Sequence, residues 1–321
     1  MAALILCFEN SLGQTKFIKV NNMTIAYESF GNTDAETILL IKGTGSQLVD
    51  WPVEFCQALA NRGYRVIRFD NRDVGLSTKL DSLGAPDWGA IIPFIKKCEP
   101  APLPYTLIDM AEDATGLLEA LNIEKAHIVG QAIGGAIAQL LTINHPEKVL
   151  TLTCIMASSG NPDLPEGDEK ALKAMSTPPP YTKDPDTLAN YLVNIYKALG
   201  SLDNESFLKK RALIHINRSW YPEGTTRQVA AGLIGDNCDR RAALARIQVP
   251  TMVIHGDVDP LVKLVCGEEV AAVVPNAELC VVKGMGHALS EKFIQTVTDC
   301  IIKNVKSIEE ESDKISYYAK Q

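Results

Sequence analysis

A short turn flanked by glycines holds the position from which a side chain could act on a substrate. A β-rich apolar run ends at Val129, glycines follow at positions 130 and 134, and a helical pattern begins at Ile133. This is the spacing of the nucleophile elbow, G-x-S-x-G, in which a strained strand-to-helix turn presents a serine hydroxyl. Ala132 stands where that serine would be. The turn therefore has the pattern of a nucleophile site that lacks its nucleophile.

An unrelated glycine-rich turn would fit this segment as well, so later segments must decide between the two interpretations. Asp259 lies just beyond a strand-like run at 251–255, and His287 lies just beyond another at 277–282. An imidazole can take the proton of a weak hydroxyl nucleophile, and a carboxylate can hold the tautomer that this requires. The chain order of nucleophile position, acid and histidine favours the elbow. Asp257 is a rival for the acid.

The elements that must position these residues alternate between strand-like and helical patterns. A hairpin over 17–20 and 23–30 opens the chain, and clear helices are expected over 106–121, with Thr106 as N-cap and Asp109 completing a capping box, and over 133–144. Further strand-like runs span 37–41, 64–69, 126–129, 149–156, 251–255 and 277–282. The pattern predicts an α/β fold with a mostly parallel sheet and helices on both faces.

One segment interrupts this alternation. Residues 161–240 are rich in proline at their start and carry helical patterns over 184–199, 204–217 and 225–234, which predicts a helical cap inserted between two strands. We therefore expect a core made of 1–160 and 241–306, a cap at 161–240, and an acidic tail at 307–321. The tail has little to bury and is expected to be solvated or frayed, with a sorting signal as the less favoured alternative.

Taken together, these segments resemble the α/β-hydrolase fold superfamily over nearly the whole chain. The resemblance is carried by the elbow, the acid loop, the histidine loop, and two loops after earlier strands, Gly43-Thr44-Gly45 and Asp70-Asn71-Arg72-Asp73-Val74-Gly75-Leu76-Ser77. The second of these loops resembles the small serine esterases that include the aclacinomycin methylesterases. The chain is thus similar to a family of Ser-His-Asp enzymes that hydrolyse carboxylic esters through an acyl-enzyme.

The resemblance implies a role for each matching position. His287 would be the general base and Asp259, which the family's G-x-x-D spacing selects over Asp257, would hold it. The backbone N–H groups of Thr44 and Ile133 would form the oxyanion hole. Gly43 and Gln131, the neighbours of these residues, would contact the substrate. Lys42 departs from the histidine that commonly precedes this glycine.

Ala132 cannot attack a carbonyl, so the chain as written is expected to be nearly inactive as an esterase. Natural loss of the nucleophile would not by itself preserve Asp259, His287 and the elbow glycines, whereas one serine-to-alanine replacement accounts for all of them. We favour an esterase silenced by that replacement. Two alternatives remain: a non-hydrolytic enzyme such as a lyase that uses His287 as a base, and a ligand-binding pseudoenzyme.

Composition limits the other possibilities. Hydrophobic residues make up 46% and charged residues 22% of the 321 residues, and the net charge is −8, so we expect a globular protein that acts on a small-molecule ester and does not bind nucleic acid. No cysteine or histidine spacing suggests a metal, and no cofactor is expected. The eight cysteines are expected to be reduced. Residues 1–8 are too short for a signal peptide and no apolar run could span a membrane, so a cytoplasmic location is predicted, with the oligomeric state undetermined.

The expected roles of several other side chains follow from their residue type alone. Arg72 could clamp a substrate, but an ion pair with Asp70 or Asp73 is favoured. The histidines other than His287 are expected to be structural: His127, His145, His215 and His255. The aromatic residues of the predicted cap could face either the pocket or the cap's own core: Tyr191, Tyr196 and Trp220.

Overall fold

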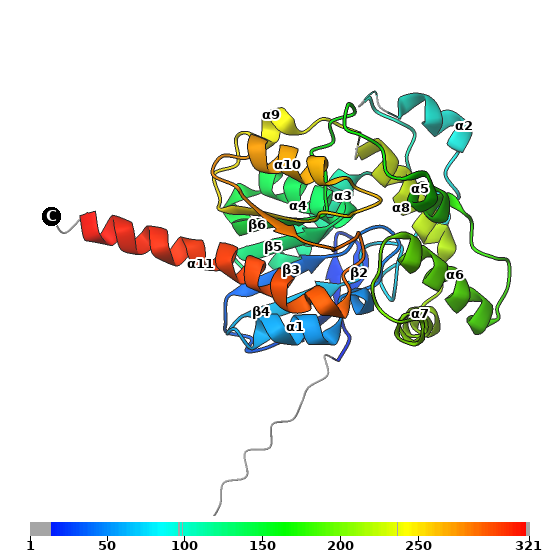
Figure 1. The fold of residues 1–321 in the computed structure, drawn as a ribbon, viewed down its shortest axis with the longest axis horizontal. Helices are drawn as coiled ribbons and strands as arrows, with labels where there is room; N and C mark the ends of the chain where they lie inside the picture. The colour runs from blue at the N-terminus through cyan, green and yellow to red at the C-terminus, as the bar shows by residue number, and fades with distance from the viewer. Residues whose placement is uncertain (1–13, 96, 98, 236, 319–321) are drawn as a thin grey trace, which may run out of the picture.

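An eight-stranded sheet forms the centre of the molecule (Figure 1). The computed structural model describes residues 14–95, 97, 99–235 and 237–318, with side chains up to residue 308, so the short apolar start at 1–8 lies outside the described residues. The strands are β1 (Lys16–Val20), β2 (Met23–Phe30), β3 (Thr37–Ile41), β4 (Arg65–Phe69), β5 (Ala126–Gln131), β6 (Val149–Ile155), β7 (Thr251–Gly256) and β8 (Glu278–Val282). Their order in the sheet is β1-β2-β4-β3-β5-β6-β7-β8.

The sheet is mostly parallel, which confirms the predicted α/β class. Only β2 runs antiparallel to its neighbours, β1 and β4, and each strand from β4 across to β8 is parallel to the next. The near-continuous apolar runs explain this arrangement, since β3 and β5 are buried along their whole length and need cover on both faces. Parallel strands end at one edge, so the loops after β3, β5 and β7 meet there.

Helices cover both faces of the sheet (Figure 1). On one face, α3 (Leu107–Ala120), α4 (Ile133–Asn144) and α10 (Leu264–Val273) contribute to one apolar cluster, and on the other, α1 (Val53–Ala60) and α11 (Ile294–Tyr318) contribute to a second. The predicted capping box of α3 is present, with Thr106 and Asp109 each accepting the other's backbone N–H. Of these helices, α3 and α4 were expected from the sequence, and each turns an apolar stripe toward the sheet.

A group of helices lies at one end of the sheet, between β6 and β7 in sequence (Figure 1). They are α5 (Glu169–Ser176), α6 (Pro185–Ala198), α7 (Glu205–Arg218) and α8 (Pro222–Gly235), and are called the cap helices below. Helices α6 and α7 pack on each other through a small cluster that includes Leu188, Ala212 and Ile216. The sequence patterns matched α6 and α7 closely, but α5 was missed and α8 begins before its expected start. Short α2 (Trp88–Ile91) and α9 (Arg241–Leu244) complete the helices.

Buried ion pairs join the cap helices to loops of the core. His215 and Arg218 of α7 contact Asp50 and Asp70 at 2.9 and 2.7 Å. Arg227 of α8 binds Asp73 through two parallel hydrogen bonds of 2.8 and 2.9 Å, and both side chains are almost fully buried. The Asp70-to-Ser77 loop that helped to identify the fold therefore serves as an anchor for the cap.

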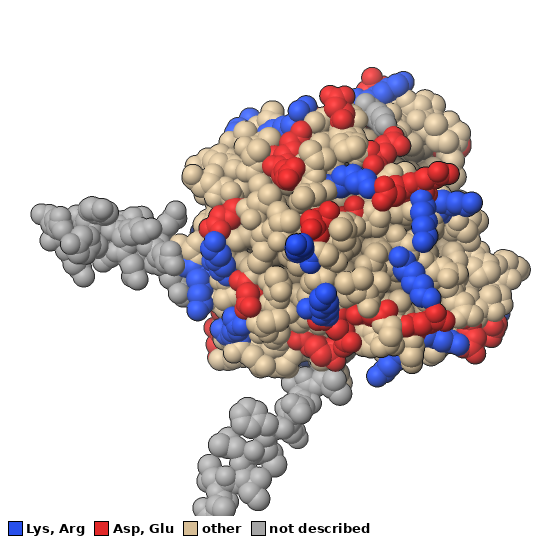
Figure 2. Space-filling model, viewed as in Figure 1, with Lys and Arg blue, Asp and Glu red and all other residues tan. Residues whose placement is uncertain are grey.

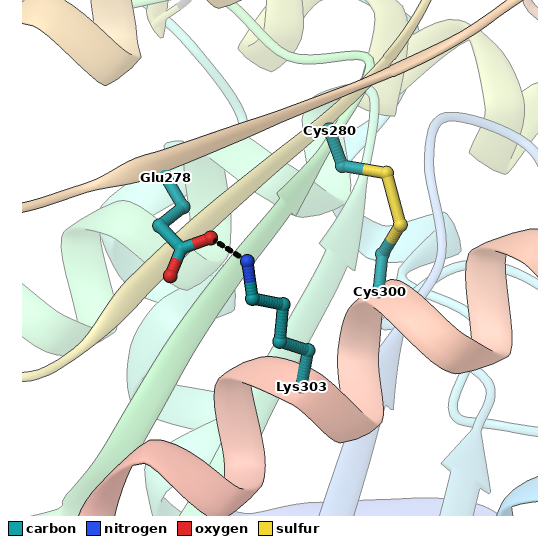
Figure 3. Close-up of a disulfide and its surroundings, with 4 residues drawn as sticks. All are labelled: Glu278, Cys280, Cys300 and Lys303. Carbon is teal, nitrogen blue, oxygen red and sulfur yellow. Dashed lines mark hydrogen bonds and ion pairs between the residues drawn. A yellow bond between two sulfur atoms is a disulfide. The ribbon is translucent and has the colours of Figure 1, made fainter.

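A disulfide corrects the prediction that the cysteines are reduced. Cys280 of β8 is bonded to Cys300 of α11. Lys303, which lies one turn after Cys300 on α11, forms an ion pair with Glu278 of β8 (Figure 3). Cys238 is disulfide-bonded as well. The prediction failed because sequence spacing does not reveal that the edge strand and the last helix lie side by side. Three other described cysteines, Cys56, Cys154 and Cys266, are buried.

The C-terminal segment also differs from its prediction. The last helix continues to Tyr318, through most of the stretch that was expected to be solvated or frayed, so fraying there is wrong. The stretch has no glycine or proline and contains three consecutive glutamates, which favour a helix. Side chains from Glu309 onward lie outside those described. Among the described residues, no helix has the length and apolar character needed to cross a bilayer.

Positive and negative charges are mixed on the face of the molecule that Figure 2 shows. On the face drawn in Figure 2, Lys and Arg alternate with Asp and Glu and gather into no continuous basic area. The same face carries wide uncharged stretches between them. Opposite charges so interspersed cancel at distances beyond about 10 Å, so this face does not carry a strong field of one sign.

The Arg227–Asp73 pair gives a test of how the cap is held. Removing one partner leaves a buried charge unpaired, so Arg227→Met and Asp73→Asn should each lower the free energy of unfolding by about 3 kcal/mol or more. The double variant should lose less than the sum, by at least about 1 kcal/mol. Urea unfolding followed by circular dichroism measures both. The exposed pair Arg62–Asp299 is the matched control and should show a coupling near zero. If the losses of unfolding free energy in the two single variants simply add up in the double variant, Arg227 and Asp73 do not anchor the cap helices as a pair.

The disulfide gives a second test. The Cys280→Ala/Cys300→Ala double variant lacks the disulfide between two residues that are 20 positions apart in the sequence. Its free energy of unfolding should be lower than that of the parent by about 3 kcal/mol under oxidising conditions. Denaturant unfolding of parent and variant measures the loss. Reduction should then affect the variant less than the parent, because among the described cysteines the variant keeps only the bond at Cys238. Equal stability of the two oxidised proteins would contradict the link.

Candidate active site

The turn between β5 and α4 holds Ala132 in a strained backbone conformation. Its φ of 53° and ψ of −126° lie in a region that residues with a side chain rarely adopt. The turn is also tightly packed: a Cβ on Gly130 would overlap the carbonyl of Gly134, and a Cβ on Gly134 would overlap the carbonyl of Ile41 at the end of β3. Both glycines are needed for this close approach. The result is an elbow whose tip is Ala132.

His287 and Asp259 meet behind this elbow. The loop after β8 carries His287, whose Nδ1 lies 2.8 Å from Oδ2 of Asp259 in the loop after β7. Asp257 instead accepts the backbone N–H of Gly284, so the rival acid faces another way. A hydrogen bond from Nδ1 to the carboxylate leaves Nε2 as the basic nitrogen of the ring. This arrangement is able to accept a proton from a group in front of the histidine.

The environment of Asp259 keeps it charged. Burial raises the pKa of this carboxyl, but His287 and the backbone N–H groups of Leu261 and Val262, which donate to Oδ1 at 2.8 and 2.9 Å, outweigh burial and hold the pKa below its usual value. His255 lies nearby with Nε2 on the carbonyl of Val262, and burial lowers its pKa. His255 thus has the position of a structural residue. Asp259 remains an anion through the neutral range, as an orienting carboxylate must.

The backbone N–H groups of Thr44 and Ile133 are available to a ligand. Among the described residues neither has a hydrogen-bond acceptor. The loop after β3 lies against the elbow, since a Cβ on Gly43 would stand 3.2 Å from the Cβ of Ala132 and 3.8 Å from the N of Ile133. The loop is fixed from the cap side by Gln228, whose Oε1 accepts the N–H of Gly45 at 2.7 Å. Two backbone N–H groups without an acceptor among the described residues therefore lie in the two loops that meet at Ala132.

Gln131 links three of the loops around the site. Its Nε2 donates to the backbone carbonyl of His287 at 3.2 Å, and its Oε1 accepts a hydrogen bond from Nζ of Lys42. The carbonyl of Leu199, at the end of α6, accepts the N–H of His287 at 2.8 Å. The histidine loop is thereby held from the elbow on one side and from the cap on the other. These two hydrogen bonds fix the position of the His287 backbone relative to the end of β5.

A cavity of about 880 Å³ opens between the sheet edge and the cap helices. Of the residues that the sequence assigned to the site, Lys42, Gly43, Thr44, Gln131, Ala132, Ile133 and His287 line it, while Asp259 lies behind His287. The aromatic residues whose orientation was left open, Tyr191, Tyr196 and Trp220, also line it, together with Leu192, Ile195 and Leu208. Large apolar walls with few polar groups are typical of a small-molecule site.

Sequence reasoning missed a second polar group in the same cavity. Lys42, Asp50 and His215 all line it, and Nδ1 of His215 lies 2.9 Å from Oδ2 of Asp50. Burial raises the pKa of Asp50, but His215, Arg211 and Lys42 outweigh it and hold that pKa well below its usual value. The position of Lys42 directly after a buried strand was the available signal. His215 sits inside a helix, where no pattern indicates which way it faces.

The partner expected for Arg72 was wrong. Its guanidinium binds the carboxylate of Asp113 on α3 at 2.6 and 2.8 Å and the carbonyl of Asp109 at 2.9 Å. The aspartates of its own loop are taken by Arg218 and Arg227 of the cap. The side chains of Arg72 and Asp73 point in opposite directions: Arg72 faces α3, and Asp73 faces α8. Arg72 does not line the cavity.

Comparisons with known proteins agree with this geometry. The family model described as alpha/beta hydrolase fold matches residues 36–292. The chain is 27% identical to the rhodomycin D methylesterase DauP of Streptomyces sp. over 86% of its own length and 92% of the relative's, and 27% identical to a putative carbamate hydrolase, RutD, of Caulobacter sp. over 80% and 86%.

Solved structures share the fold. A serine-to-alanine mutant of the meta-cleavage product hydrolase CumD from Pseudomonas fluorescens, complexed with acetates, superposes with a TM-score of 0.69 over 92% of this chain and 98% of that one, at 20% identity. The relatives named here are hydrolases, and their similarity extends over most of the chain. With an elbow, a His–Asp pair and two free backbone donors around one cavity, this chain belongs to the alpha/beta hydrolase fold family.

Proposed function

We propose that this chain is the scaffold of a carboxylic-ester hydrolase with a Ser-His-Asp triad, in which Ala132 occupies the place of the serine. The observation that carries the proposal is the backbone at Ala132. A φ of 53° with a ψ of −126° costs on the order of 1–3 kcal/mol for a residue with a Cβ. An alanine gains nothing from such a turn, whereas a serine would gain an exposed hydroxyl aimed into the cavity.

The reaction of the serine form follows from the positions of the other groups. The hydroxyl attacks the ester carbonyl carbon while Nε2 of His287 takes its proton, and Asp259 stabilises the imidazolium. The N–H groups of Ile133 and Thr44 bind the oxyanion of the tetrahedral intermediate. His287 returns the proton to the leaving alcohol, and a water activated by His287 then hydrolyses the acyl-enzyme. Gly43 and Gln131 line the space in which the ester lies.

The substrate class follows from the cavity. Its volume of about 880 Å³ and its aromatic walls suit an ester with a bulky apolar part. One relative is a rhodomycin D methylesterase, which is compatible with an ester whose alcohol part is small. We further propose the division made from the sequence: a core of 1–160 and 241–306, a cap of 161–240, and a tail from 307.

The location of the protein is a separate matter. A cytoplasmic location stays a prediction from the sequence. The Cys280–Cys300 disulfide is an argument against it, because disulfides persist mainly in oxidising compartments.

Restoring the hydroxyl tests the proposal. The Ala132→Ser variant should hydrolyse a bulky p-nitrophenyl ester at least about 10³-fold faster than the chain as written, since loss of a triad nucleophile typically costs that much or more. Release of p-nitrophenol gives the rate. Adding His287→Ala to the variant should return the rate to the level of the alanine form, whereas adding His145→Ala, a surface histidine, should not.

The same assays separate the alternatives. If neither the alanine nor the serine form hydrolyses any ester of a panel that varies acyl length and alcohol, the esterase proposal is wrong. A lyase that uses His287 as base would instead show activity in the alanine form that disappears with His287→Ala. A binding protein would show neither.

A further inference from the structure

An amine lies in the cavity that the ester mechanism does not use. Lys42 directly follows β3 and is 7% exposed, and it lines the cavity together with Ala132 and His287. A lysine so deeply buried is unusual unless it is paired with a carboxylate. Its place at the carboxyl end of a parallel strand, beside the elbow, puts it within the region where ligands bind in such folds. Its chemistry therefore requires an explanation of its own.

The neighbours of Lys42 hold its amine without neutralising it. Nζ donates to Oε1 of Gln131, and it stands 4.2 Å from the ring centroid of Trp51. Among the described residues, no carboxylate lies within ion-pairing distance of Nζ. The titratable groups that act on it from other elements are Asp50 at the turn before α1, Arg211 on α7 and the Cys56 thiol on α1. A neutral amide and an aromatic face fix the position of the nitrogen and leave its lone pair usable once the proton is lost.

Burial makes loss of that proton easy. Removal from water lowers the pKa of Lys42 to about 7, with Asp50 opposing the shift and Arg211 adding to it. About half of the chains would then carry a neutral amine at pH 7, against roughly 3 in 10,000 for an exposed lysine with an ordinary pKa. Lys79 provides a comparison, because burial lowers its pKa to about 8 but it does not line the cavity. Lys79 donates to the carbonyl of Gly75.

We propose that Lys42 is a nucleophilic amine that captures small apolar aldehydes and ketones as an imine in the cavity beside Ala132. The carbonyl group is selected by the amine, and the apolar part by the walls that include Tyr196, Leu208 and Trp220. This site is distinct from the ester mechanism, because the bond forms to Nζ of Lys42 and requires neither a residue with a hydroxyl at position 132 nor an acyl group.

The step balances without any oxidant or reductant. The lone pair of the neutral amine attacks the carbonyl carbon, the C=O π electrons move to oxygen, and proton transfer gives a carbinolamine. The hydroxyl takes a proton from solvent and leaves as water, and the nitrogen gives its second proton back to solvent, which leaves the C=N bond of the imine. His215, whose Nδ1 lies 2.9 Å from Oδ2 of Asp50, lines the same cavity and is one imidazole that can assist the loss of water. The step is reversible, so the carbonyl compound returns when water is added back.

Reductive trapping tests the proposal on the chain as it stands. The protein is incubated briefly at pH 7 with hexanal and sodium cyanoborohydride, whose hydride converts the imine to a stable secondary amine, and the modified lysines are located by peptide mass mapping. Lys42 should gain a hexyl group faster than Lys79 by about 5-fold and faster than exposed lysines by about 10² to 10³-fold. Its labelling should rise with pH through about 7 and then level off. The α-amino group, whose ordinary pKa is near 8, is mapped separately.

Controls separate the cavity from simple reactivity. Excess hexanol, which fills the cavity but forms no imine, should slow labelling at Lys42 and leave Lys79 unchanged. The polar aldehyde glyoxylate should label Lys42 far more slowly than hexanal does. Lys42→Met should remove the fast adduct, with its fold checked by circular dichroism, although the map of the parent chain needs no variant.

Other results would overturn the proposal. They are labelling that follows surface exposure, no adduct at Lys42, or equal labelling by hexanal and glyoxylate. Because the experiment uses the alanine form and measures no ester hydrolysis, its failure leaves the Ala132→Ser assay untouched, and failure of that assay leaves this experiment untouched.

Discussion

The shared edge of parallel strands is the constraint on which the site depends. Because β3, β5 and β7 run in one direction, the loops that leave them must emerge together, and Thr44, Ala132 and Asp259 are carried there by chain segments far apart in sequence. The packing of the elbow against the end of β3 then sets the spacing, since Gly134 allows the elbow to rest on the carbonyl of Ile41. Nothing larger than hydrogen fits there. The positions of the two free backbone donors follow from that one contact.

The cap helices cover this edge of the sheet and leave a cavity beneath them. Buried pairs of charged and polar side chains hold these helices in place. Aspartates of core loops at positions 50, 70 and 73 each receive a cationic or imidazole partner from α7 or α8. Buried ion pairs contribute little to net stability compared with apolar packing, but breaking one is costly, so they specify where the cap sits rather than how strongly the protein folds. The apolar walls remain free to contact a ligand. Lys42 stands apart because none of the described residues gives it an anionic partner at bonding distance.

The sequence was sufficient for the features that rest on short-range patterns. Continuous apolar runs placed the strands, and the glycine spacing placed Ala132 in its turn. The capping residue Thr106 located the start of α3. Features that depend on contacts between distant segments could not be read in this way. The ion-pair partners of Arg72, the disulfide from Cys280 to Cys300 and the direction faced by His215 all require knowing which elements are neighbours in space. Lys42 was noticed only as a departure from a familiar pattern, because its burial becomes visible once the cap is in place.

The central claim is that position 132 is a nucleophile site from which only the hydroxyl is missing. The most direct measurement is active-site titration of the Ala132→Ser variant with a fluorophosphonate, which reacts only with an activated hydroxyl, followed by intact-mass analysis. We expect one phosphonyl group per chain, located at position 132, and none in the alanine form or when His287→Ala is added. A folded serine variant that takes up no phosphonyl group would contradict it.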